Sequence, residues 1–246
     1  MEASVQEKYD YIVIGGGVVG AMIARWLSRY EGKLLLIEKE ADIGMGCSSA
    51  NTAIVHAGYD PLPGSLKALM NVKANPMWDQ LAGELNFPFE RRGDYVVAIG
   101  EEELPLIHKL MDQGIKNGVP GMRMLDAAEM RSRERDINPE TSGALWATTG
   151  GICDPFQVTV AAAENAVING ATVLLNTKFE DFIWEGTRVI GVKTNRGDFF
   201  ARWVINSAGI YSDAVMHKAG VRPEFIIKPR KGEYFIFDRA EVQIHN

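Results

Sequence analysis

The sequence predicts an α/β protein with a parallel sheet in its N-terminal part, and three observations indicate this. Residues 9–14 and 33–38 contain uninterrupted apolar runs, which are typical of strands buried on both faces of a parallel sheet. Residues 18–30, between them, repeat apolar side chains at helical spacing. A glycine-rich turn joins the first run to this helix. A strand, a helix and a strand in about thirty residues form a βαβ unit.

The middle of the chain predicts a loop followed by elements of both types. Residues 40–64 are rich in Gly, Ser, Asn and Pro, so we expect mostly loop there. Residues 66–85 predict a helical segment, which Pro76 kinks or splits because proline has no backbone N–H to donate. Residues 95–99 predict a strand, and the helix after it carries the three glutamates 101–103 at its positive end.

The C-terminal part predicts two capped helices and a series of short strands. Asp126 is expected to cap a short helix that extends to Met130. Asp154 and Pro155 open a longer helix that ends before Gly170. Polar turns between apolar runs predict an antiparallel meander, then a further strand and a hairpin. The predicted strands are residues 173–175, 182–184, 189–192, 199–201, 204–206, 225–227 and 234–237.

Composition limits the function classes that this chain can belong to. Its 246 residues carry a net charge of −6, which disfavours a nucleic-acid partner. The chain has no apolar run of about 20 residues and no apolar signal core near its N-terminus. We therefore expect no transmembrane segment and a cytoplasmic protein, with peripheral binding at the inner face of the membrane left open. The two cysteines, Cys47 and Cys153, lack metal-ligand spacing, so we expect no metal site.

The glycine-rich turn carries the clearest chemical signal. Gly15, Gly17 and Gly20 form a G-x-G-x-x-G pattern, and the acidic Glu38 ends the next strand. The glycines permit a tight turn, close approach to a pyrophosphate and close packing of the helix, whose N-terminus attracts phosphate. Glu38 is suited to bind ribose hydroxyls and would repel a 2′-phosphate, so NADP is disfavoured while FAD and NAD both remain open.

Several further stretches resemble the FAD site of the D-amino-acid-oxidase-like flavoprotein superfamily. Residues 46–59 carry the resemblance first, and they include a Cys-Ser-Ser-Ala-Asn-Thr run and a His-Ala-Gly. This His-Ala-Gly and the Pro-Gly-Ser-Leu-Lys-Ala at 63–68 are similar to the glycerol-3-phosphate dehydrogenase and L-2-hydroxyglutarate oxidase branch in particular. Residues 204–213 and 228–234 resemble the second cofactor-contacting strand and the opening of a substrate-domain strand of that branch.

The resemblance implies an architecture and a longer chain. It implies a Rossmann-like FAD-binding domain of the glutathione-reductase type, with an inserted β-meander and a partial α+β substrate domain. The FAD-binding domain would take residues 1–85 and 146–222, and the substrate domain residues 86–145 and 223–246. Because the family fold continues after Phe237 with further substrate-domain strands and a return into the flavin domain, we expect the sequence to be truncated at its C-terminus.

The resemblance also implies noncovalent FAD and a set of site residues. His56 would lie near the flavin ring and orient the substrate or take its hydroxyl proton, whereas the alternative is a histidine that only shapes the loop. In some related flavoproteins a histidine in this region is bonded covalently to the flavin. The implied cofactor-binding residues are Gly15, Gly17, Val18, Val19, Gly20, Glu38, Lys39, Cys47, Ser48, Ser49, Asn51, Thr52, His56, Phe179, Ser207, Ala208 and Gly209.

The implied activity is hydride transfer from a small anionic hydroxy compound, similar to glycerol 3-phosphate, to the flavin. L-2-hydroxyglutarate or another 2-hydroxy acid, an amino acid, and a non-catalytic FAD-binding fragment are the alternatives. Quinone-linked glycerol-3-phosphate dehydrogenases carry an Arg-Tyr pair soon after the His-x-Gly, and Tyr59-Asp60-Pro61 stands there in this chain. The electron acceptor, whether oxygen, a quinone or a partner subunit, is left open.

Overall fold

The computed structural model describes residues 8–233, 235, 238 and 240–241, and contacts divide the chain into two compact units. The first unit consists of Met1–Asn51 and Pro155–Gly232, and the second of Thr52–Asp154 and Glu233–Asn246. The division therefore falls after Asn51 and Asp154, whereas the sequence places the domain boundaries after residues 85 and 145. Those functional domain boundaries stay a prediction.

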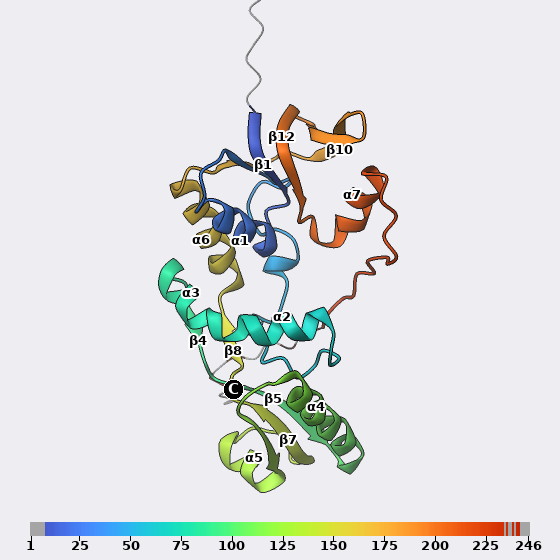
Figure 1. Ribbon diagram of the computed structural model, residues 1–246. Coiled ribbons are helices and arrows are strands. Elements are labelled where there is room, and N and C mark those ends of the chain that lie inside the picture. The colour runs from blue at the N-terminus through green and yellow to red at the C-terminus, as the bar shows by residue number, and fades with distance from the viewer. Residues whose placement is uncertain (1–7, 234, 236–237, 239, 242–246) are drawn as a thin grey trace, which may run out of the picture. The chain divides into compact units, whose positions relative to one another are not determined.

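The first unit is built on a six-stranded sheet in the order β10-β11-β12-β1-β2-β9 (Figure 1). The strands β12, β1, β2 and β9 are parallel, and β10, β11 and β12 form the antiparallel meander. This sheet confirms the predicted α/β fold class. The elements are β1 (Lys8–Ile14), α1 (Val18–Leu27), β2 (Leu34–Ile37), the 3-10 turn η1 (Cys47–Ser49), α6 (Pro155–Ile168), β9 (Thr172–Leu174), β10 (Phe179–Glu185), β11 (Arg188–Thr194), β12 (Gly197–Asn206), η4 (Gly209–Tyr211) and α7 (Ser212–Lys218).

The apolar runs of β1 and β2 are uninterrupted because both faces of the sheet are covered. Ile12 and Leu35 point into one core, which also contains residues of the meander and of α7. Val13 and Leu36 point into the other core, with Ala24 of α1 and residues of α6. The two helices pack against each other on that face (Figure 1). Alternate residues of each strand thus enter opposite cores, as the pleat of a strand requires.

The strand β12 joins the meander to the parallel sheet. The sequence predicts two separate strands, 199–201 and 204–206, but the structure has one continuous strand from Gly197 to Asn206. Its first half pairs antiparallel with β11, and from Phe200 onwards it also pairs parallel with β1. Its C-terminal end therefore lies beside the end of β1, where the glycine turn begins.

The second unit combines helices with two small antiparallel sheets, in the orders β3-β8-β4 and β5-β7-β6. Its core holds Tyr59, Ile107 and Leu145, with the face of α4 packed on β7. The elements are β3 (Ile54–Val55), α2 (Leu66–Ala74), η2 (Asn75–Met77), α3 (Trp78–Leu85), β4 (Phe89–Glu90), β5 (Asp94–Ile99), η3 (Glu101–Glu103), α4 (Leu104–Asn117), β6 (Met122–Asp126), α5 (Ala127–Arg133), β7 (Thr141–Ala147) and β8 (Gly151–Cys153).

Local signals in the sequence are confirmed in this unit. Pro76 splits the helical segment, since α2 ends at Ala74 and α3 begins at Trp78. The Asp126 side chain caps α5 by accepting hydrogen bonds from the backbone N–H groups of Ala128 and Glu129, both at 2.8 Å. The pattern missed β3, β4, β6, β7 and β8.

The predicted C-terminal hairpin is not confirmed. Residues 225–227 form no strand, so that prediction is wrong, and most of the predicted strand 234–237 lies outside the described residues. A run of three apolar residues satisfies a strand pattern, but a strand also needs a neighbour for its backbone hydrogen bonds. Within the described part of the chain, no helix has the length and apolar character that crossing a membrane requires.

Candidate cofactor site

The glycine turn, residues 15–20, connects the end of β1 to the start of α1. Gly15 has a φ of +102°, in the region that favours glycine, and a Cβ there would lie 2.6 Å from the backbone oxygen of Ser207. A Cβ on Gly20 would lie 1.9 Å from the backbone oxygen of Gly15. Neither position therefore has room for a side chain, because the turn packs closely against both α1 and the residues that follow β12.

Glu38 is the acidic residue after β2, and its carboxylate lies against the glycine turn. The side chain is only 8% exposed. One carboxylate oxygen accepts a hydrogen bond from the Gly16 backbone N–H at 2.6 Å, and the other accepts from the Glu40 backbone N–H at 2.9 Å. Each carboxylate oxygen has a second lone pair, so both keep capacity to accept from a hydroxyl of a bound ribose. The turn thus holds the carboxylate in place beside the position that a dinucleotide would take.

The N-terminus of α1 is completed by a residue from a distant loop. The N-cap residue is Gly17, which has no side chain to cap the helix, and the first turn contains no acidic residue. The Ser48 hydroxyl oxygen instead accepts the Val18 backbone N–H at 2.8 Å, across thirty residues of sequence. A Cβ on Gly17 would lie 3.2 Å from this same hydroxyl. Because Ser48 is the acceptor here, its own proton is available to a phosphate oxygen at this positive helix end.

The loop that carries Ser48 is held by its own side chains. The Ser49 hydroxyl donates to the Gly46 backbone oxygen at 3.0 Å, and the Asn51 side-chain amide donates to the backbone oxygens of Cys47 and Ser48. The Cys47 side chain is exposed. In this structure Ser49 and Asn51 therefore shape the loop, and direct cofactor contacts from them stay a prediction.

The residues after β12 are bound directly to the glycine turn. Ser207 donates its backbone N–H and its hydroxyl to the Ile14 backbone oxygen, at 3.0 and 2.8 Å. Its hydroxyl also lies 3.2 Å from the Gly15 oxygen. Ala208 donates its backbone N–H to the Asn206 side chain, and Gly209 has a φ of +57°. The ends of the two parallel strands are thus joined into one surface, as expected where a nucleotide binds at the carboxyl ends of parallel strands.

Two further predicted residues of the first unit, Lys39 and Phe179, contact neighbouring side chains. Lys39 is exposed, forms a 2.9 Å ion pair with Glu40 and lies 4.6 Å from the centre of the Tyr211 ring. Its hydrogen bond to Glu40 raises the pKa of the Lys39 amine. The Phe179 ring packs on Phe182, with ring centres 4.8 Å apart. The Phe179 ring thus packs against the core of the first unit, and a cofactor contact from Phe179 stays a prediction.

Thr52 and His56 belong to the second unit. The His56 side chain is exposed, and its backbone oxygen accepts a hydrogen bond from the Asn75 side chain at 3.0 Å. Asn75 was not among the predicted site residues, and the available signal was a polar residue at a helix end directly before Pro76.

The Tyr59 hydroxyl is buried within the second unit. Tyr59 is 7% exposed, and its hydroxyl donates a 2.5 Å hydrogen bond to the Asp94 carboxylate. Burial raises the pKa of the Tyr59 hydroxyl and of the Asp94 carboxyl. Burial is the largest cause for Asp94, and the hydrogen bond from Tyr59 and the nearby His56 oppose it. Tyr59 therefore does not take the place of the Arg-Tyr pair that helps bind substrate in the quinone-linked dehydrogenases.

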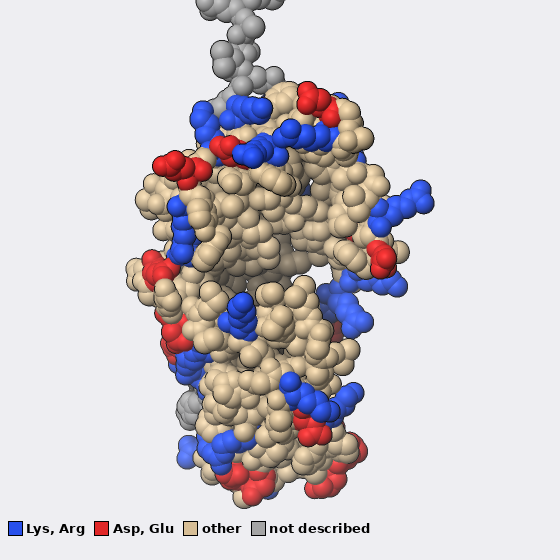
Figure 2. Space-filling view, in the orientation of Figure 1, with Lys and Arg blue, Asp and Glu red and all other residues tan. Residues whose placement is uncertain are grey.

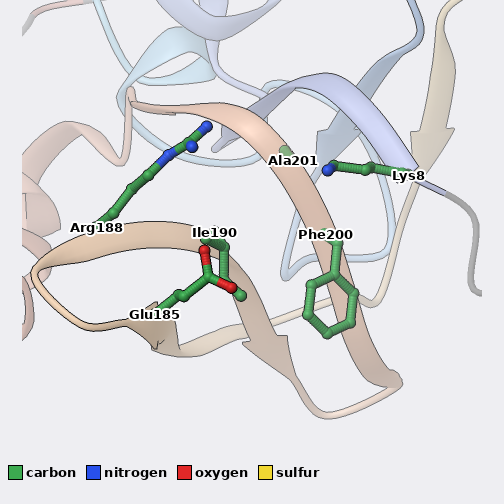
Figure 3. Close-up of a pocket in the computed structure, with 6 residues that line it drawn as sticks. All are labelled: Lys8, Glu185, Arg188, Ile190, Phe200 and Ala201. Carbon is green, nitrogen blue, oxygen red and sulfur yellow. The ribbon is translucent and has the colours of Figure 1, made fainter.

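A separate surface pocket lies at the other end of β1. Its volume is about 220 Å³, and Figure 3 shows the residues that line it, Lys8, Glu185, Arg188, Ile190, Phe200 and Ala201. Lys8 begins β1, and the glycine turn follows its last residue, Ile14, about 20 Å away along a strand of this length. This pocket is therefore not the nucleotide site.

On the face drawn in Figure 2, basic and acidic side chains are interspersed.

The groups brought together around α1 fit the ADP half of FAD. The helix N-terminus at Gly17 carries no side chain, and this helix end and Ser48 offer donors to a pyrophosphate. The buried Glu38 carboxylate offers acceptors to ribose. The spacing of the glycines and Glu38 predicted them from the sequence, whereas Ser48 was implied by the family resemblance.

The chain matches the family model described as FAD dependent oxidoreductase over residues 10–246. It is 41% identical to a glycerol 3-phosphate dehydrogenase of Caloramator mitchellensis, over 94% of this chain and 48% of that protein. It is 31% identical to a mitochondrial L-2-hydroxyglutarate dehydrogenase of Nematostella vectensis, over 94% of this chain and 53% of that protein.

Solved structures agree with these sequence matches. An FAD-bound L-alpha-glycerophosphate oxidase from Mycoplasma pneumoniae superimposes with a TM-score of 0.81 at 28% identity, over 87% of this chain and 58% of that one. A glycine oxidase from Bacillus cereus gives 0.76 at 27% identity, over 85% and 57%. The chain spans about half the length of the curated relatives it matches. Because the family model covers nearly the whole sequence, this chain belongs to the family of FAD-dependent oxidoreductases.

Proposed function

We propose that this protein holds FAD at the end of β1 and takes part in oxidising a small anionic hydroxy compound similar to glycerol 3-phosphate. The observation that carries the proposal is the Glu38 carboxylate, buried and hydrogen-bonded to the Gly16 N–H inside the glycine turn. That arrangement pairs a ribose acceptor with a phosphate-binding helix end.

Each element of the site has a proposed role. Glu38 accepts hydrogen bonds from the ribose hydroxyls of the adenosine, and the N-terminus of α1 with Ser48 binds the pyrophosphate. FAD, when bound, supplies the hydride acceptor. His56 orients the substrate hydroxyl or takes its proton. The remaining proposed cofactor contacts are Gly15, Gly17, Val18, Val19, Gly20, Lys39, Cys47, Ser49, Asn51, Thr52, Phe179, Ser207, Ala208 and Gly209.

Two substrates are supported by different observations. The 41% identity to a glycerol 3-phosphate dehydrogenase favours glycerol 3-phosphate. L-2-hydroxyglutarate is the second candidate, because several dehydrogenases of that compound are about 30% identical to this chain. Tyr59 stands in the stretch where an Arg-Tyr pair would bind glycerol 3-phosphate, but its hydroxyl binds Asp94 instead. The lack of that pair also favours L-2-hydroxyglutarate over glycerol 3-phosphate.

The test is anaerobic reduction of the FAD-loaded protein, followed at the visible flavin band. We expect glycerol 3-phosphate to abolish the band within minutes and L-proline or glycine to leave it unchanged. We expect His56→Gln to slow the reduction by about 100-fold, as for loss of a general base, and His108→Gln, on the exposed side of α4, to leave the rate unchanged. No flavin absorbance after incubation with FAD, or no reduction by either hydroxy compound, would contradict the proposal.

The electron acceptor and the location are tested with the same reduced protein. Reoxidation by oxygen, by a soluble quinone analogue or only by added cell extract separates the three acceptors. We place the protein in the cytoplasm, and a quinone acceptor would bring it to the inner face of the membrane as a peripheral protein. Co-sedimentation with anionic vesicles at low salt, reversed by high salt, is the expected sign of such binding.

A further inference from the structure

Hydrogen bonds join four segments of the second unit at one end of the sheet β3-β8-β4. β8 runs antiparallel to both neighbours, so the ends of β3 and β4 lie beside the start of β8. His56 directly follows β3, Arg91 directly follows β4, and Thr149 precedes β8 by two residues. Asn75, at the junction of α2 and η2, supplies the fourth segment.

Asn75 is the centre of the hydrogen bonds at this end. It is 6% exposed, and its side-chain amide donates to the backbone oxygens of His56 at 3.0 Å and Thr149 at 2.9 Å. Its side-chain oxygen accepts from the Arg91 guanidinium at 2.8 Å. Every polar atom of this buried amide thus has a partner, which leaves it one orientation.

Arg91 is itself fixed from several sides. Its guanidinium donates to the backbone oxygens of Asn75 at 2.6 Å and Thr149 at 2.5 Å, and to the Asp79 carboxylate at 2.6 Å. The same group lies 5.1 Å from the centre of the Phe89 ring. Because the planar guanidinium donates to several acceptors at once, these bonds determine both its position and its orientation.

We propose that Asn75 is a positioning residue that fixes the backbone at His56, with Arg91 and Asp79 holding Asn75 in the required orientation. The proposal rests on the role proposed above for His56. His56 has an exposed side chain and follows a two-residue strand, so β3 by itself gives its backbone little support. A displacement of about 1 Å in a group that handles a proton is enough to lower a rate by about 100-fold.

A general stabilising role for the same bonds makes a different prediction, and Asn117 provides the matched control. Its side-chain amide also donates to two backbone oxygens of the same segment, those of Gly58 and Pro61, at 3.0 and 2.8 Å. It does not bind His56. If any lost hydrogen bond to this segment had the same effect, Asn117→Ala and Asn75→Ala would behave alike.

The experiment uses the full 246-residue chain with ¹³C-labelled histidine, first without flavin and then loaded with FAD. We expect Asn75→Ala to shift and broaden the His56 imidazole signal, and Asn117→Ala to leave it at its wild-type position. The signals of His108 and His217 act as internal references. In the FAD-loaded protein with its best substrate, we expect Asn75→Ala to lower kcat by about 10-fold or more, with KM changed less than threefold, because positioning affects the reacting geometry.

A second variant keeps the test decisive if Asn75→Ala does not fold. Arg91→Lys keeps the charge and loses the planar set of donors, and we expect the same change in the His56 signal. An unchanged His56 signal in both variants, or an equal change in Asn117→Ala, refutes the proposal. The flavin-free spectra report on the Asn75 contact alone. A failure to bind FAD would therefore contradict the proposed function but would not affect this test of Asn75.

Discussion

Replacing Gly20 with alanine is the sharpest test of the packing that creates the cofactor site. The new Cβ would lie 1.9 Å from the Gly15 backbone oxygen, and Cβ atoms do not approach other atoms closer than about 3.0 Å. The turn and α1 must therefore separate by roughly 1 Å. A backbone carbonyl cannot rotate away as a flexible side chain could.

The expected magnitude follows from two opposing effects. Alanine gains about 1 kcal/mol over glycine inside a helix. Overpacking typically costs about 1–3 kcal/mol, and a clash with backbone belongs at or above the upper end of that range. We expect Gly20→Ala to lower the free energy of unfolding by about 2 kcal/mol or more, and the melting temperature by at least about 4–8 °C for a chain of this size. FAD binding should weaken at least about tenfold, or about 1.4 kcal/mol.

Gly83→Ala is the matched control, because it places alanine in a helix without a clash. Gly83 lies inside α3, and nothing is within 4 Å of its Cβ position. We expect this variant to be stabilised by about 0.5–1 kcal/mol and to bind FAD as the wild type does. Urea unfolding and titration of FAD by fluorescence quenching measure both quantities. The reasoning is wrong if Gly20→Ala matches Gly83→Ala in stability and affinity.

Three further predictions concern polar groups. The side chain in Glu38→Gln has one oxygen for two backbone N–H donors. We therefore expect the free energy of unfolding to fall by about 1–3 kcal/mol and FAD to bind more weakly. An unchanged affinity for FAD would show that Glu38 does not contact the cofactor. Burial raises the pKa of Asp94, so the folded protein holds that proton more tightly and loses stability as the pH rises above about 4. Asp94→Asn should therefore match the wild type in urea midpoint near pH 3 and exceed it increasingly toward pH 7, whereas a constant difference would count against this. Asp126→Ala should cost about 1 kcal/mol by removing the cap of α5 and should leave FAD affinity unchanged.

The sequence by itself determined the features whose causes lie within a few residues. The βαβ unit, the glycine turn, the cap at Asp126 and the split at Pro76 each follow from spacing, side-chain type and backbone restriction. Family resemblance then extended the turn to an FAD site. Short elements escaped because a strand of two residues, such as β3 or β4, is too short to show a period.

Only the tertiary structure decided which distant groups meet. Ser48 caps α1 from thirty residues away, Ser207 joins the end of β12 to the glycine turn, and Asn75 binds the backbone at His56. None of these contacts leaves a periodic signal, because each depends on where folded segments cross rather than on local preference. Burial and the full pairing of polar groups select them, and both exist only once the chain is packed.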